Sequence, residues 1–208
     1  MRSTILNSAR AFSLLLLSSG ACALAQQNVP LHFSGIINDY SPSTVKGGPW
    51  EMHGQWALDL HKEWHGEWVT TADFSTDMTM SDYGTTAGVA DATKGGQSPH
   101  THHIKLTNQP VVWNMDGCPA VSPATTMGFQ IGGTVSLITG NGSGAPFETD
   151  PITTTLQVCV TGGDQVPYSN VTLVFVGPAT MHFGTQAIHG VVRKASPNAI
   201  GIGREFPR

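Results

Sequence analysis

The sequence has few charged side chains, only 12% of its 208 residues, which is about half the share found in an average soluble protein. That shortage excludes a coiled coil and a charged disordered chain. No run of lysines or arginines occurs and the formal net charge is −4, so the sequence has no basic patch of the kind that binds nucleic acid. Glycine (24) and proline (13) are frequent, which favours many short strands and turns over long helices.

Long apolar runs are also missing, so no segment predicts a helix that spans a membrane. The apolar residues 11–17 follow Arg2 and Arg10 and precede the small residues Ala23 and Ala25. This arrangement predicts a signal peptide over residues 1–25. Lipid attachment through Cys22 is the alternative. We expect a single domain over residues 26–195, a loose tail over residues 196–208, and a secreted or periplasmic protein.

Cysteine is scarce as well, because the chain has only three. Removal of residues 1–25 would leave Cys118 and Cys159, and an exported chain with two cysteines most simply forms one disulfide. A loop of that length contributes about 4 kcal/mol of stability in the chain-entropy description. Two buried free thiols are the alternative. No C-x-x-C redox motif is present.

Residues 50–60 alternate strictly between apolar and polar side chains, which is typical of a strand with one buried face. Residues 68–80 repeat this pattern, and residues 62–66 between them predict the turn of a long hairpin. Trp50, Trp56 and Trp68 fall on the apolar faces, so we expect them to pack in the core.

Further strands are predicted over residues 31–37, 100–107, 111–115, 127–139, 152–161, 170–176 and 187–193. Turns are expected at residues 108–110, 116–117, 140–142 and 162–164, with a long loop over residues 81–99. About nine strands with short links and no clear helix indicate an all-β fold. We expect an antiparallel meander that forms a closed or nearly closed barrel, with a two-layer β-sandwich as the alternative.

The chain has nine histidines, and the densest group lies on the predicted strand at residues 100–107. His100 and His102 share a face with apolar residues, and two imidazoles at this spacing can chelate one metal ion. His182 or His189 would supply further ligands, and zinc or copper suits such a nitrogen-rich set. The alternatives are buried neutral histidines that bond to backbone carbonyls or threonines, and a role in proton transfer or ligand anchoring.

Other catalytic signals are weak. The sequence has no G-x-S-x-G, H-E-x-x-H, P-loop or dinucleotide fingerprint. Asp73 and Asp77 alternate with apolar residues, which predicts a solvated strand face. Trp64 lies in the predicted turn and is the best candidate for an exposed tryptophan that stacks on a sugar ring or another small molecule.

Several segments resemble a group of exported bacterial proteins. They include the sequences HTHHI at residues 100–104, HFGTQ at 182–186 and HGVVR at 189–193, together with residues 35–40, 48–51, 72–74 and 81–83. The resemblance covers most of residues 31–193. It implies an exported all-β domain and supplies no catalytic residue.

Taken together, these patterns favour an exported β-barrel that acts as a binding or structural protein, with a small molecule or carbohydrate as a possible partner. The alternatives are a metalloenzyme that holds zinc or copper through its histidines, and a carbohydrate-binding module that uses exposed tryptophan.

Overall fold

The computed structural model describes residues 31–45, 49–82, 100–121, 125, 127–141, 154–162 and 169–196. The signal peptide expected over residues 1–25, including Cys22, lies outside the described residues. So do residues 83–99 of the long loop and residues 197–208 of the tail.

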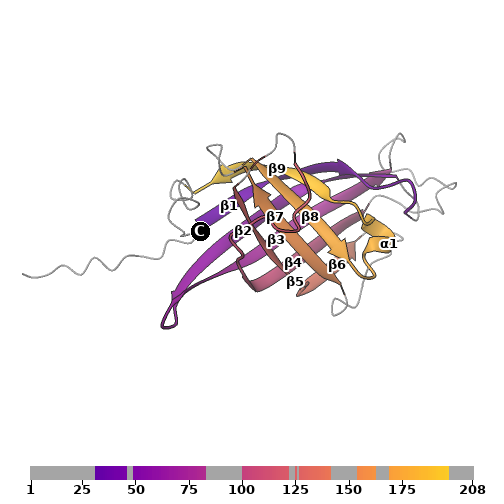
Figure 1. Cartoon of the computed structure of the whole chain (residues 1–208). Helices are drawn as coiled ribbons and strands as arrows, with labels where there is room; N and C mark the ends of the chain where they lie inside the picture. Colours follow the sequence, from indigo (N-terminus) through magenta and orange to yellow (C-terminus); the bar gives the residue numbers. More distant parts are fainter. Residues whose placement is uncertain are drawn as a thin grey trace, which may run out of the picture.

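One antiparallel sheet of nine strands forms the molecule, in the order β5-β7-β8-β9-β1-β2-β3-β4-β6 (Figure 1). The strands and the single short helix of the described residues are β1 (Leu31–Tyr40), β2 (Trp50–Trp64), β3 (Trp68–Asp82), β4 (His100–Pro110), β5 (Gly128–Thr134), β6 (Leu137–Asn141), β7 (Thr155–Thr161), β8 (Asn170–Val176), α1 (Thr180–Phe183) and β9 (Ile188–Ala195).

The sheet curls into a nearly closed up-and-down barrel, because neighbours in sequence pair and β9 returns to pair with β1. Only Val135 and Ser136 separate β5 from β6, so these two segments are halves of one bent strand. The β6 half pairs with β4 and the β5 half pairs with β7. Within the described ranges no ladder joins β4 to β5, and this seam is left unsealed. The predicted antiparallel barrel is therefore confirmed, and the sandwich alternative is not.

The barrel interior is filled by the apolar face of each strand. Met52, Trp56, Leu58 and Leu60 of β2 are all buried, and so are the alternate residues of β3 opposite them. This is the arrangement expected of a small barrel, in which side chains fill the interior and leave no channel. The alternation in the sequence therefore predicted correctly which face of the long hairpin is buried.

The expectation for Trp68 is wrong, since 56% of this side chain is exposed. The β2–β3 hairpin is longer than predicted: β2 continues to Trp64, and β3 begins at Trp68 directly opposite. Its tip extends past the end of the barrel (Figure 1), where no core is available to cover an inward-facing position.

The expected strand over residues 111–115 does not form. β4 instead runs through Pro110, beyond the turn predicted at residues 108–110, and a single bridge joins Val112 to Gln130 of β5. The Gln130 side chain then donates to the backbone carbonyls of Asn114 and Asp116, so no regular ladder continues. Cys118, three residues after Met115, is joined to Cys159 of β7, which confirms the predicted disulfide.

A one-turn helix, α1, lies between β8 and β9 at one end of the barrel (Figure 1), where no helix was expected. It follows Pro178 and ends at Gly184, whose φ of +89° suits glycine. A Cβ at Gly184 would also lie 2.6 Å from the Pro42 ring. Four residues are too few for a helical period to be read in the sequence, which is why the pattern missed it.

Candidate metal centre

Two histidines reach the barrel interior because β4 alternates. His100 and His102 are 3% and 0% exposed, whereas Thr101 and His103 between and beside them point toward solvent. Each inward histidine faces a methionine across the β3–β4 ladder: His100 pairs with Met80, and His102 pairs with Met78. The predicted common face of His100 and His102 is confirmed.

The third histidine comes from α1. Phe183 is fully buried and stacks on Phe175 of β8, with ring centroids 4.5 Å apart. This contact anchors the one-turn helix against the barrel, and it directs His182, which is 2% exposed, toward β4. The Phe183 ring also lies edge-on to His102, with centroids 5.0 Å apart.

The three imidazoles converge through the same ring atom. The Nε2 atom of His182 lies 3.0 Å from Nε2 of His100 and 2.9 Å from Nε2 of His102. A neutral ring nitrogen carries either one N–H or one lone pair in the ring plane. The Nε2 of His182 therefore forms a linear hydrogen bond with only one of its two neighbours, and hydrogen bonding alone does not account for the convergence.

A metal ion does account for it, because it accepts a lone pair from each ring at once. Two zinc–nitrogen bonds of about 2.1 Å that meet at a tetrahedral angle place their nitrogens about 3.4 Å apart. The Nε2 atom of His182 would need to move only about half an ångström from each of its two neighbours to reach that spacing. Within the described part of the chain, His100, His102 and His182 form the one group of three or more possible ligands, and their ligand atoms lie within 4.8 Å of one another.

The surroundings keep His182 uncharged at neutral pH. Burial, together with the smaller effects of the neighbouring His102 and His100, lowers the pKa of His182 from 6.5 to about 3. Trp50 packs edge-on to His100, with centroids 5.4 Å apart. His182 is consequently neutral at neutral pH, so one of its two ring nitrogens carries a lone pair that a metal can accept.

His189, the other residue named as a possible ligand, lies outside this cluster. It faces outward on β9, where its backbone N–H and its Nδ1 both contact the Asp39 carboxylate, at 2.7 and 2.9 Å. It lines a shallow pocket of about 540 Å³ on the outer wall. The His189–Asp39 contacts tie the start of β9 to the end of β1.

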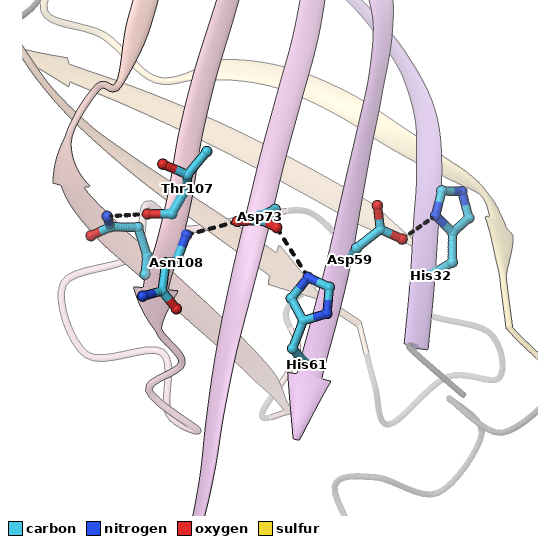
Figure 2. A network of polar contacts seen from close by, with 7 residues as sticks. His32, Asp59, His61, Asp73, Thr107 and Asn108 are labelled. Carbon is cyan, nitrogen blue, oxygen red and sulfur yellow. Dashed lines mark hydrogen bonds and ion pairs between the residues drawn. The ribbon is translucent and has the colours of Figure 1, made fainter. Parts of the chain in front are cut away.

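The remaining histidines share this surface pattern. Together with His189, five others pair with a carboxylate: His32 with Asp59, His53 with Glu51, His61 with Asp73, His65 with Glu63, and His103 with Asp77. Figure 2 shows two of these pairs on neighbouring strands, where the other oxygen of Asp73 accepts a bond from the backbone N–H of Asn108. The nine histidines thus divide into six with an acidic partner and the three that converge in the interior.

The aspartates lie on a solvated strand face as predicted, whereas Trp64 is exposed as predicted but ends β2 instead of lying in the turn. Asp73 and Asp77 face outward and bond to histidines of the same sheet, so they form no carboxylate pair of their own. Trp64 is 61% exposed and meets the edge of Trp68, with centroids 5.3 Å apart. The Lys62 ammonium lies 4.9 Å from the centre of the Trp68 ring.

No family model matches the sequence, and neither a curated protein nor a solved structure matches the chain.

Proposed function

We propose that this protein binds one transition-metal ion, zinc or copper, through the Nε2 atoms of His100, His102 and His182. The observation that carries the proposal is the convergence of three buried imidazoles, which come from β4 and α1, on one point. Three histidines around one position are a common ligand set for both metals.

The proposed setting is outside the cytoplasm. The disulfide between Cys118 and Cys159 is consistent with a periplasmic or extracellular location. No helix in the described ranges is long and apolar enough to cross a membrane. The proposed function is therefore that of an exported barrel that binds a metal ion. The sequence favoured a binding protein with an unidentified ligand, and the proposal names that ligand.

The test is metal content. Protein made without a histidine tag is stripped with a chelator, incubated separately with zinc and copper, desalted and analysed by elemental mass spectrometry. We expect about one ion per chain, and less than about a tenth of an equivalent in the His102→Ala and His182→Gln variants.

The matched control is His103→Ala, which removes the neighbouring histidine of β4 that faces solvent. This variant should retain the ion. The proposal fails if the unaltered chain binds less than about a tenth of an equivalent of zinc and also less than about a tenth of an equivalent of copper. It also fails if loss of His103 removes as much metal as loss of His102.

A further inference from the structure

The ligand set at the three-histidine cluster carries no negative charge. In the described residues no aspartate, glutamate or cysteine joins His100, His102 and His182, and all three are buried. The cost of moving an ion from water into an apolar interior rises with the square of its charge, so a divalent ion costs about four times as much as a monovalent ion of the same size. An uncharged, buried ligand set therefore favours a monovalent ion.

The number of ligands leads to the same conclusion. Zinc in proteins is almost always four-coordinate, and a site with three protein ligands leaves a position for water or substrate. Here α1 and the Phe183 ring cover the cluster, and the three histidines are at most 3% exposed. Copper(I) has a filled d shell and forms stable three-coordinate complexes with imidazole, so it needs no fourth position.

Three buried methionines are cross-strand neighbours of the cluster or of one another. Met80 is the direct cross-strand partner of His100, Met78 is that of His102, and Met52 pairs with Met80 on the next strand. All three methionines are 0% exposed and face the interior. Side chains directly opposite on an antiparallel pair have Cβ atoms about 5 Å apart, which is within reach of a thioether. Thioether sulfur is a soft ligand that suits copper(I), whereas zinc in proteins is held by thiolate, imidazole and carboxylate.

On the basis of the proposed metal site, we infer that its ion is copper(I), held by the three Nε2 atoms and surrounded by the thioethers of Met78 and Met80. The molecule is then an exported copper(I)-binding protein. The inference depends on the proposed function, and it goes further by selecting the oxidation state and the element.

The experiment compares two affinities on the same stripped, untagged protein. Copper(I) is supplied anaerobically with ascorbate and competed with bicinchoninate, and zinc is competed with a chromophoric pyridylazo chelator. We expect copper(I) to bind about 1,000-fold more tightly than zinc, a difference of about 4 kcal/mol. After exposure to air, the bound copper should remain silent in electron paramagnetic resonance, because the site disfavours the divalent state.

A double variant tests the thioethers directly. Met78→Leu with Met80→Leu keeps the apolar volume and removes both sulfurs, so folding should be retained. We expect copper(I) affinity to fall about tenfold or more while zinc affinity stays the same. Met181→Leu is the matched control, because Met181 adjoins His182 in the sequence but is 75% exposed. It should change neither affinity.

The possible failures are distinguishable. If zinc binds as tightly as copper(I), or if the air-exposed protein gives a stoichiometric copper(II) signal, the inference is overturned while the proposed metal site stands. If the double variant binds copper(I) as the unaltered chain does, the role of the thioethers is refuted. If neither metal binds at one equivalent, the inference and the proposed function fail together.

Discussion

Acid should destabilise the metal-free protein through His182. This histidine has a pKa of 6.5 when exposed and about 3 in the folded barrel. Above about pH 6.5 neither the folded nor the unfolded chain holds a proton there. As the pH falls below that value, the unfolded chain takes up a proton that the folded chain refuses, so the free energy of unfolding decreases until the folded pKa is reached.

The magnitude follows from that difference. Each pKa unit between the unfolded and folded states corresponds to about 1.4 kcal/mol of unfolding free energy. The full loss of stability at about pH 3 is therefore about 5 kcal/mol, and about 3 kcal/mol is already lost near pH 4.5. His182 is only 2% exposed, so solvent screens little of this cost. A domain of this size has about 5–15 kcal/mol of stability in total, and the loss is therefore a large part of it.

The assay is urea unfolding of the chelator-treated protein near pH 7 and near pH 4.5, for the unaltered chain and for His182→Gln. The glutamine amide does not titrate, so the variant should lose about 3 kcal/mol less over this interval. The six histidines with acidic partners are present in both proteins, and their contributions cancel in the comparison.

Equal losses of stability in the two proteins would refute the assignment of a buried, unprotonated His182. Urea unfolding with excess metal added is a second test of the protonation of His182. It should raise the free energy of unfolding near pH 7 and raise it much less near pH 4.5, because protons compete with metal for the same lone pairs.

Three further predictions concern the barrel. Replacement of both cysteines with serine should lower the free energy of unfolding by about 4 kcal/mol in urea titrations, because the bond closes a loop with a sequence separation of 41; a loss below about 1 kcal/mol would contradict this. Gly35→Ala should cost about 3 kcal/mol or prevent folding, because its Cβ would lie 1.8 Å from the Val191 carbonyl oxygen, whereas Gly132→Ala meets nothing closer than 3.7 Å and serves as the control. Trp64→Ala and Trp68→Ala should each lower the free energy of unfolding by no more than about 1 kcal/mol, since both rings are mostly exposed and pair with each other across the hairpin; a loss above about 2 kcal/mol would mean that the hairpin tip packs against other residues.

The strand alternation made most of the fold predictable. It identified the faces of β2 and β3 correctly, and β8 has the predicted bounds of residues 170–176. The period of two reports which face is buried, and it is reliable where a strand has a continuous core beside it. It fails where the core ends, as at Trp68. It also fails where a side chain binds backbone carbonyls that a neighbouring strand would otherwise pair with, as the Gln130 side chain does at Asn114.

The site was only half predictable for a related reason. His100 and His102 lie on one strand, so their common face follows from the backbone alone. The sequence named both His182 and His189 as further candidate ligands, and no sequence pattern indicated that only His182 lies beside His100 and His102. The choice depends on the packing of Phe183 against Phe175, which is a tertiary contact. The neighbouring methionines were likewise visible as core residues, but their pairing with the histidines depends on the register of β3 and β4.

The placement of the cluster also indicates which part of the molecule controls access to the ion. Two ligands lie on β4, within the continuous sheet, and the third lies on a helix of four residues that has no side-chain N-cap. A helix this short is not stable by itself, so burial of His182 and Phe183 holds it in place. Opening of α1 would remove one ligand and expose the other two without breaking any strand pairing. Under the proposed function, entry and release of the ion would therefore require only this local opening, whose free energy is smaller than that of global unfolding.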